Sequence, residues 1–369
     1  MAGIYIHIPF CRQACHYCNF HFTTSLRYKN ELLAALLKET ELQKAYLLEE
    51  IIETIYFGGG TPSLLEISDL RLQIEKLKQT FSVSDNAEVT LEANPDDITE
   101  EKLIDWKEAG INRLSIGVQS FFEEDLKWMN RAHNAQQASD NLQLAIKQFN
   151  NITIDLIYGH PLLTDDKWKQ NVEQVISMNI PHISCYALTV EPKTPLQRLI
   201  SEHKKEDVNP EQQSKQFSML MNWLEEAGYE HYEISNFAKP GFRSRHNSSY
   251  WQRKKYLGLG PSAHSFNGVS RQWNIANNNI YIDSLLKNIL PFEIENLTAT
   301  QQLNEYIMTS LRTIEGLVMN NVPEDAQQKL QATSKRFIDS GKMILLNNKL
   351  ILTKEGKLFA DGIAADLFF

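Results

Sequence analysis

Three cysteines stand on one short loop near the start of the chain, Cys11, Cys15 and Cys18, and the sequence holds only four cysteines in all. Thiolates at this spacing can bind three irons of a [4Fe–4S] cluster and leave the fourth iron open. An open iron can bind a small molecule through an amine and a carboxylate, which a site closed by four cysteines does not offer. The loop therefore predicts an iron–sulfur cluster with one coordination position left for a ligand.

Other interpretations of this loop are weaker, although zinc stays open. A structural zinc site needs four ligands, and because Cys185 lies far along the chain, one of His7, His16 or His21 would have to complete it. Disulfides are disfavoured because four cysteines in 369 residues do not make a secreted scaffold, and no signal segment precedes the loop. Cys185 itself stands in an apolar strand and is interpreted as a core thiol. The loop favours an iron–sulfur cluster.

The composition is that of an ordinary soluble globular protein, with 42% hydrophobic and 22% charged residues. A formal net charge of -9 argues against a general nucleic-acid binder, which needs a basic surface to neutralise phosphates. No apolar run approaches the ~20 residues that cross a bilayer, so membrane contact would be peripheral at most. We expect a cytoplasmic protein, in a compartment that keeps thiolates available to iron.

Short strand patterns alternate with amphipathic helical patterns over the first half of the chain. The strand candidates are Gly3–Ile8, Thr54–Phe57, Glu88–Glu92, Arg113–Val118, Thr153–Tyr158 and His182–Leu188. The helix candidates between them are Asn30–Leu48, Asp69–Thr80, Glu100–Ala109, Gln136–Phe149 and Lys167–Met178. Alternation with short connections predicts parallel strands joined by right-handed crossovers. Six such units favour an α/β fold with a partial (β/α)6 barrel, although periodicity alone does not exclude a flat sheet.

The pattern changes after about residue 200. The candidates there are a helix over Glu211–Ala227, a strand over Tyr232–Phe237, an aromatic, basic loop over Lys239–Lys255, and two helices over Thr300–Ile314 and Pro323–Ser340. A short hairpin follows the last helix. We predict a (β/α) core over residues 1–235, a connecting segment over 236–290, and a small, mostly α domain over 291–369.

Polar and glycine residues fall where the predicted strands end. They are Cys11, Gly58–Thr61, Glu92 and Gln119, and Asp155 lies within the fifth predicted strand. Because parallel strands bring their carboxyl ends to one edge, these residues are expected to surround one site. Glycines allow the backbone to approach a ligand closely, so this turn is a candidate for binding the amino group of an amino acid. The simpler alternative is a tight strand-to-helix turn.

Charged residues near the same strand ends suit one kind of ligand. Glu92 and Asp155 could bind ribose hydroxyls, and Arg131 could bind a carboxylate. An adenosyl amino acid presents both kinds of group. Each of these residues taken alone is more often a surface or capping residue, so this prediction depends on the cysteine loop.

A second candidate site is the run His246-Asn247-Ser248-Ser249-Tyr250-Trp251, which has arginines on both sides. An imidazole for a metal, aromatic faces for stacking and arginines for carboxylates suit a flat, anionic ligand. The alternative is a histidine with satisfied hydrogen bonds, beside aromatics that close the bottom of the barrel or the seam between domains. The residues alone favour this structural alternative.

The cluster loop and further motifs resemble the radical S-adenosylmethionine family, specifically its coproporphyrinogen-dehydrogenase-like branch. The motifs lie within Tyr5–Cys18, Gly58–Ser63, Leu91–Pro95, Ser115–Phe121, Asp155–Gly159, Tyr256–Ser265 and Leu352–Gly356. They cover nearly the whole chain. The run from His246 to Trp251 is similar to the motif that marks the haem-chaperone-like members of this branch.

The resemblance implies a radical S-adenosylmethionine barrel with a [4Fe–4S] cluster on the three loop cysteines and S-adenosylmethionine on the open iron. It also implies that Tyr5 lies against the methionine end, that Gly59, Gly60 and Thr61 contact the amino group, and that Arg131 contacts the carboxylate. Glu92, Gln119 and Asp155 would bind around the ribose and carboxylate, and Ala187 and His264 would approach the adenine by position. His246, Asn247, Tyr250 and Trp251 become candidates for contacts with haem.

One departure from the family pattern bears on function. The oxidase of this branch ends its cluster loop with Cys-x-Cys, whereas here Phe20 stands in the last position, and the longer N-terminal segment of the oxidase is missing. Because phenylalanine cannot replace a thiol in proton or electron transfer, we expect a haem chaperone that passes haem to an acceptor protein. A homodimer is a candidate state of this chaperone. The alternatives are an oxygen-independent coproporphyrinogen III dehydrogenase, another radical enzyme acting on a porphyrinogen, and a cluster protein acting only as a scaffold.

Overall fold

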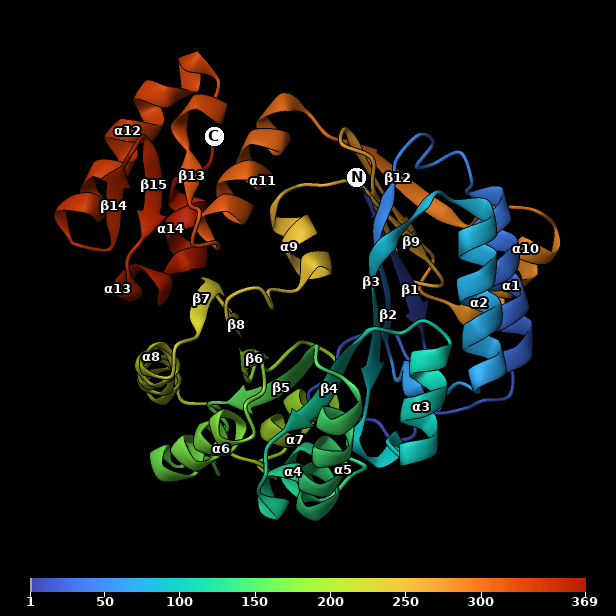
Figure 1. Cartoon of the computed structure of the whole chain (residues 1–369). Coiled ribbons are helices and arrows are strands. Elements are labelled where there is room, and N and C mark those ends of the chain that lie inside the picture. The colour runs from blue at the N-terminus through green and yellow to red at the C-terminus, as the bar shows by residue number, and fades with distance from the viewer. Residues whose placement is uncertain (1) are drawn as a thin grey trace.

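The computed structural model describes residues 2–369, and its main feature is a sheet of 12 strands in the order β12-β11-β10-β9-β1-β2-β3-β4-β5-β6-β8-β7. The central strands are β1 (Ala2–Ile8), β2 (Ile52–Gly59), β3 (Val83–Ala93), β4 (Arg113–Gln119), β5 (Ile152–Tyr158) and β6 (His182–Ala187). Each pairs in parallel with the next, and the sheet curves strongly between β1 and β6 (Figure 1). The predicted partial (β/α)6 barrel is confirmed.

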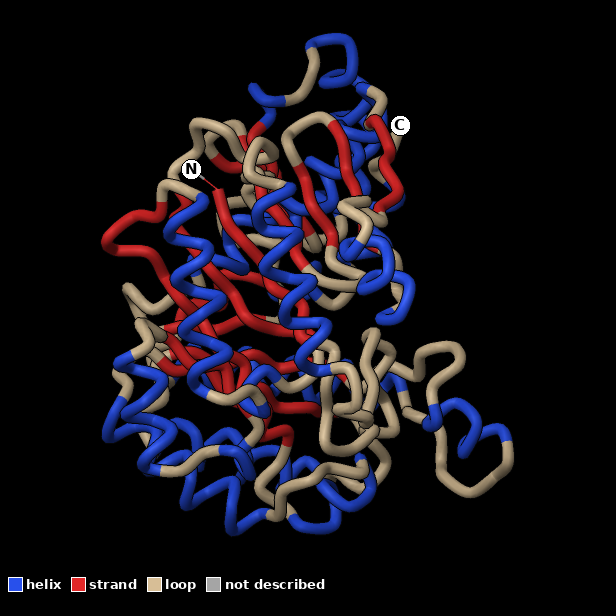
Figure 2. Tube along the Cα trace, turned by 90° about the vertical axis from the view of Figure 1, so that its right-hand side faces the viewer, coloured by secondary structure: helices blue, strands red, loops and turns tan. Residues whose placement is uncertain are grey.

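Helices cover the outer face of these strands (Figures 1 and 2). They are α1 (Lys29–Leu42), α2 (Ile67–Thr80), α3 (Glu100–Glu108), α4 (Glu123–Met129), α5 (Ala135–Gln148) and α6 (Asp165–Ser177). Apolar residues at helical spacing, such as Leu32 and Leu36, are fully buried against the sheet. The side chains of Thr99, Asn134 and Thr164 each accept a hydrogen bond from a backbone N–H in the first turn of α3, α5 and α6. The amphipathic pattern and these caps explain why the helices form here.

Shorter elements extend the sheet at both edges. They are β7 (Glu230–Glu233), β8 (Asn236–Ala238), β9 (Tyr256–Leu259), β10 (His264–Phe266), β11 (Ser270–Asn274) and β12 (Phe292–Asn296). Three further helices are α7 (Pro195–Ser201), α8 (Pro210–Glu226) and α10 (Asn278–Leu286). Helix α8 packs on β7 and α10 on α1, whereas α7 lies by the cysteine loop, where the Leu196 N–H donates to the His16 carbonyl oxygen at 2.8 Å. Residues 236–290, predicted as a connecting segment, therefore contribute β8 to β11 to the main sheet.

Two local predictions beyond residue 230 were wrong. The single strand expected over Tyr232–Phe237 is divided into β7 and β8, which pair with each other in antiparallel fashion around a turn. The loop expected over Lys239–Lys255 contains a helix, α9 (Arg245–Trp251). The Glu88 carboxylate of β3 accepts hydrogen bonds from the backbone N–H groups of residues 245 and 246, at 3.2 and 3.0 Å. This contact is remote in sequence, so no local pattern could predict the start of α9.

The C-terminal part has a hydrophobic core of its own. It contains α11 (Ala299–Leu311), β13 (Leu317–Val318), α12 (Glu324–Asp339), β14 (Met343–Leu346), β15 (Lys349–Leu352), α13 (Lys354–Lys357) and α14 (Ala360–Asp366). A three-stranded sheet in the order β13-β15-β14 packs with these helices around Ile307, Leu330 and Ile363. Figure 1 shows α11 beside α9, where this part meets the barrel. The mostly α character predicted for the tail is confirmed.

A buried carboxylate fixes α1 to the strands at the far edge of the barrel. Glu39 is fully buried and accepts hydrogen bonds from the Gly260 N–H at 2.8 Å, the Asn274 amide at 2.6 Å and the Tyr281 hydroxyl at 2.5 Å. Gly260 has a positive φ of 103°, and a Cβ there would lie 2.5 Å from the carbonyl oxygen of His7. The run from Tyr256 to Ser265 therefore contains a structural joint that holds β9 beside β1.

The structure also bears on membrane insertion. Within residues 2–369, none of the helices combines the length and the apolar character that crossing a bilayer requires.

Candidate cluster and cofactor site

The three loop cysteines line one cavity of about 450 Å³ at the carboxyl ends of the central strands. Eight other candidate residues contribute to the same wall, namely Gly59, Gly60, Thr61, Glu92, Gln119, Arg131, Asp155 and Ala187. Most come from the carboxyl ends of β2, β3, β4 and β6, whereas Asp155 lies in the middle of β5 and Arg131 follows α4. The sequence places these residues far apart, and the parallel topology brings them together.

The cysteine loop is held by backbone hydrogen bonds to its surroundings. Cys11 follows β1 closely, and its N–H donates to the Thr23 carbonyl oxygen at 3.0 Å. The N–H of Cys18 donates to the Cys15 carbonyl oxygen at 3.3 Å, which forms a turn between two candidate ligands. The N–H of His16 donates to the carbonyl oxygen of residue 129, at the end of α4. These bonds hold the loop over the cavity.

The donor set of the loop consists of three thiols that line one cavity. Zinc with four ligands requires its thiolates to converge on one ion at ~2.3 Å. Among residues 2–369, the structure gathers no such group of three His, Cys, Asp or Glu side chains. A [4Fe–4S] cluster instead takes one thiolate on each of three irons, and Cys11, Cys15 and Cys18 all face one cavity. The residues present therefore fit a three-cysteine cluster.

Burial affects the thiols before iron is bound. It raises the pKa of Cys11 to about 11, although a hydrogen bond with Thr61 opposes this shift, and it also raises the pKa of Cys18. Iron binds the thiolate form, so loading the cluster releases protons from these cysteines.

The glycine turn after β2 comes as close to the cysteine loop as backbone allows. The Gly60 N–H donates to the Ile8 carbonyl oxygen at 2.8 Å, and a Cβ on Gly60 would lie 2.6 Å from the Phe10 carbonyl oxygen. Gly59 has a positive φ of 104°, and a Cβ there would lie 2.6 Å from the His7 ring. Residues with side chains would force the two loops apart, which explains why glycines are required here.

Two half-buried carboxyl groups face the cavity. Burial raises the pKa of Glu92 to about 7, although hydrogen bonds from the Tyr56 hydroxyl at 2.8 Å and the Gly59 N–H at 3.1 Å oppose the shift. Burial likewise raises the pKa of Asp155 to about 6, against a hydrogen bond with Ser184. A carboxylate in such a place accepts hydrogen bonds well because little water competes, which suits paired ribose hydroxyls.

Arg131 supplies the positive charge of the cavity. Its guanidinium donates to the Asn94 side-chain oxygen at 2.7 Å and to the Gly117 carbonyl oxygen at 2.9 Å. It also lies 3.3 Å from both the Cys15 Sγ and the Tyr17 hydroxyl. The group is thus fixed between the cluster loop and β4, where it can bind a ligand carboxylate beside the cluster.

Two of the predicted cofactor residues lie elsewhere. Tyr5 does not line the cavity; its ring packs among Tyr56 and His246, with centroids 6.1 and 6.5 Å away. His264 stands exposed on β10, where its ring stacks on Trp273 at 6.1 Å. Because β10 continues the sheet beyond β9 and β1, it is separated from the strand ends that form the cavity. The structure therefore does not bring His264 to the predicted adenine site.

The candidate haem motif is divided between two places. His246 is buried in the barrel, with Nδ1 2.7 Å from the Thr54 hydroxyl and Nε2 2.8 Å from the Tyr250 hydroxyl. Burial lowers the pKa of His246 to about 3, so the ring is neutral. Trp251 instead faces the seam with the C-terminal part, where the Arg312 guanidinium lies 5.1 Å from its ring. Asn247 lies in the first turn of α9, and its N–H donates to the hydroxyl of the capping residue Ser244 at 3.2 Å.

Sequence reasoning did not assign some residues that contribute to the site. Asn94 orients Arg131 and stands in the run after β3 that the family motif includes. Tyr186 at the end of β6 and Phe20 on the cluster loop both line the cavity, and they are 43% and 66% exposed. Tyr56 fixes Glu92 from the preceding strand. The only sequence signal for Tyr56 was its position just before the glycine turn.

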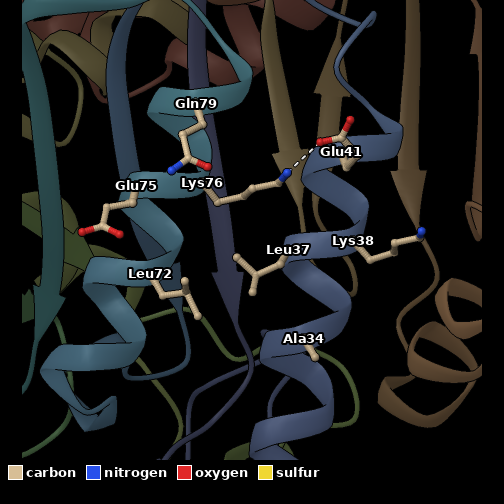
Figure 3. A pocket seen from close by; sticks show the side chains of 8 residues that line it. All are labelled: Ala34, Leu37, Lys38, Glu41, Leu72, Glu75, Lys76 and Gln79. Carbon is tan, nitrogen blue, oxygen red and sulfur yellow. Dashed lines mark hydrogen bonds and ion pairs between the residues drawn. The ribbon is translucent and has the colours of Figure 1, made fainter.

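Another hollow, of about 460 Å³, lies on the outer surface between α1 and α2 (Figure 3). An ion pair between Lys76 and Glu41, 2.6 Å long, spans it. Its other lining residues are alkyl and polar side chains, without a cysteine or a glycine turn. It therefore offers none of the chemistry of the cluster cavity.

Comparison with known proteins shows to which family this chain belongs. The model of the radical SAM superfamily matches residues 5–175. The heme chaperone HemW of Bacillus subtilis (strain 168) is 33% identical, with 98% of both chains covered. The heme chaperone HemW of Escherichia coli (strain K12) is 36% identical over 71% of this chain and 69% of that protein. This chain belongs to the HemW branch of the radical SAM superfamily.

A solved structure shows how this chain folds relative to its wider family. Coproporphyrinogen III oxidase (HemN) from Escherichia coli, a radical SAM enzyme, superposes with a TM-score of 0.85. The alignment covers 100% of this chain and 90% of that one, at 21% identity. The likeness at this identity establishes a shared fold for the barrel and the C-terminal part.

Proposed function

We propose that this HemW-branch protein is a haem chaperone that binds haem and transfers it to an acceptor protein. The observation that carries the proposal is the similarity over almost the full chain to proteins that are heme chaperones. The exposed phenyl ring of Phe20, in the position where the oxidase has a further cysteine, supports a role other than porphyrinogen oxidation.

The cavity supports binding of a [4Fe–4S] cluster and S-adenosylmethionine. Cys11, Cys15 and Cys18 would hold three irons. Gly59, Gly60 and Thr61 would lie at the ligand's amino group, Arg131 at its carboxylate, Glu92, Gln119 and Asp155 around its ribose, and Ala187 near its adenine. When bound, this pair of groups supplies one-electron reductive cleavage of the sulfonium. The chain itself contributes a fixed cation, two half-buried carboxyl groups and a wall that limits access of water.

The geometry restricts how haem could use the His246 motif. Both ring nitrogens of His246 are already bonded, to Thr54 and Tyr250, and the ring is buried. Coordination of haem iron by this ring requires one of those bonds to break and α9 to leave its place in the barrel. We therefore propose that haem contact at this motif, through His246, Asn247, Tyr250 and Trp251, depends on displacement of α9.

The proposal is tested by anaerobic titration of the cluster-loaded protein with haem, followed by the Soret absorption band. We expect saturable binding at about one haem per chain, and loss of most of it in His246→Ala. His203→Ala, which changes an exposed histidine after α7, serves as the control and is expected to bind normally. Absence of saturable binding in the unmodified protein would refute the chaperone function.

The alternative is a radical enzyme that acts on a porphyrinogen, and the cysteines, glycine turn and Arg131 that line the cavity are what favour it. A radical enzyme would form 5′-deoxyadenosine in proportion to porphyrin product, whereas a chaperone would bind haem without such turnover. Measuring both products in one anaerobic reaction distinguishes the two functions. We propose that the acceptor of haem is a protein. We also propose a homodimer as one state of the chaperone. Measuring the molecular mass in solution with and without haem tests the homodimer.

A further inference from the structure

Tyr56 lies between the cofactor cavity and the helix that carries the haem motif. On one side its hydroxyl donates to the Glu92 Oε1 at 2.8 Å, and Glu92 lines the cavity. On the other side its ring stacks on His246, with centroids 4.9 Å apart and planes 23° apart. One side chain on β2 therefore contacts both functional regions.

The cavity side of this contact determines how Glu92 is oriented. The second carboxylate oxygen, Oε2, accepts from the Gly59 N–H at 3.1 Å. With one donor on each oxygen, the plane of the carboxylate is fixed before a ligand arrives. Such preorganisation strengthens binding because less freedom is lost on association. Loss of the Tyr56 hydroxyl would leave Oε1 without this donor and allow the carboxylate to turn.

The other side of the contact depends on the position of α9. Thr54 and Tyr250 fix the two ring nitrogens of His246, and the Glu88 carboxylate accepts from its backbone N–H at 3.0 Å. These bonds hold the imidazole against the Tyr56 ring. If α9 left the barrel, Tyr56 would lose its stacking partner and gain freedom to rotate, which would loosen its hold on Glu92.

We propose that Tyr56 is a positioning residue that couples α9 to the cofactor cavity, holding Glu92 toward the S-adenosyl ligand only while His246 is in place. The inference rests on the proposed function, because it takes S-adenosylmethionine as the ligand of the cavity. Coupling between two sites is reciprocal. Ligand binding in the cavity thus stabilises the closed position of α9, and displacement of α9 weakens ligand binding.

The test measures S-adenosylmethionine binding to the full, cluster-loaded chain by anaerobic equilibrium dialysis. Tyr56→Phe keeps the ring and removes the hydroxyl, and we expect the Kd to rise about tenfold, as for loss of a hydrogen bond to a charged group. Tyr256→Phe is the matched control, because this ring packs on Tyr250 at 4.7 Å and has no contact with Glu92. Its Kd is expected to stay unchanged.

A double-mutant cycle tests the link to α9. Thr54→Val removes the bond to His246 Nδ1 with little change in shape, and we expect the Kd to rise about threefold in the wild-type background. In the Tyr56→Phe background the same change is expected to have no effect, because the connection to Glu92 is already broken. Additive effects would overturn the coupling. Iron content and far-ultraviolet circular dichroism are checked for every variant.

The pH profile of binding separates positioning from a general structural effect. The hydrogen bond from Tyr56 lowers the pKa of Glu92, which burial raises to about 7, so its loss raises that pKa further. Because binding needs the carboxylate form, the pH below which affinity falls should move upward in Tyr56→Phe. Other ionisable groups also interact electrostatically with the Glu92 carboxyl group, and Tyr56→Phe leaves all of them in place. They are Tyr5, Cys18, Asp155, Tyr186 and Tyr250.

The results of these experiments distinguish failure of the proposed coupling from failure of the proposed function. If the unmodified, cluster-loaded chain binds no S-adenosylmethionine, the proposed cofactor is wrong and the inference falls with it. If the chain binds the ligand but Tyr56→Phe changes neither Kd nor pH profile, the cofactor proposal stands and the role of Tyr56 is refuted.

Discussion

The buried carboxyl group of Glu39 provides the sharpest test of how the barrel is held together. Burial raises its pKa from 4.5 to about 7, although hydrogen bonds from Tyr281, Gly260 and Asn274 oppose the shift. The folded state thus holds this proton more tightly than the unfolded chain does. The contribution of the protonated Glu39 to stability is fully present below pH 4.5 and is lost as the pH rises through 7. The linkage between proton binding and folding makes this loss about 3 kcal/mol.

Glu39→Gln removes this titration while keeping the shape of the side chain. At pH 5 the variant should be less stable by about 1–2 kcal/mol, because the amide NH₂ cannot accept from the donors that surround it. Between pH 5 and pH 8 the wild-type protein loses stability that the variant keeps. The difference in unfolding free energy should therefore move by about 2 kcal/mol in favour of the variant at pH 8.

Urea unfolding at the two pH values measures this difference through tryptophan fluorescence, for which the chain has 6 tryptophans. Glu31→Gln, an exposed position in the first turn of α1, is the matched control and should show no comparable pH effect. A destabilisation of Glu39→Gln that is the same at both pH values would refute the reasoning. It would show that Glu39 does not carry a raised pKa in the folded protein.

Three further predictions concern the cluster cavity. Gly60→Ala should lower the iron content after reconstitution, because its Cβ would lie 2.6 Å from a backbone oxygen of the cysteine loop, whereas Gly362→Ala, with open space around it, should retain full iron; equal iron in both would contradict the close approach. Cys15→Ala should abolish the visible absorption of the cluster, and Cys185→Ala, in the apolar core, should leave it intact; unchanged iron and sulfide in Cys15→Ala would show that the cluster assignment is wrong. Arg131→Met should weaken S-adenosylmethionine binding about tenfold in equilibrium dialysis, since it removes the cation that can pair with a carboxylate; an unchanged Kd would exclude that role.

Much of the architecture could be predicted from local sequence patterns. The six central strands and their helices follow from apolar periodicity, which depends only on neighbouring residues. The gathering of Glu92, near the end of β3, and Asp155, within β5, around one site then follows from the rule that parallel strands share one functional edge. The structure places both in the cavity with the cysteines, as the rule requires.

The features that local patterns missed depend on remote contacts. Helix α9 starts where Glu88 accepts its first N–H groups, and Glu39 is buried only because β9, β11 and α10 pack on α1. His264 belongs to a family motif, yet it lies on β10, away from the cavity, because the edge strands continue the sheet beyond β1. Membership of a motif did not determine whether His264 would lie near the strand ends that form the cavity.

The sequence by itself determined the chemistry of this protein: three thiols at fixed spacing, a glycine turn, and acidic groups at strand ends. Residue types and their spacing are enough for this, because ligand chemistry belongs to the side chains. Only the tertiary structure decided that His246 is a neutral, fully bonded ring beside Tyr56, and that Tyr56 reaches Glu92. Burial and hydrogen-bond partners arise from packing between segments far apart in the chain, so they become defined only when the barrel closes.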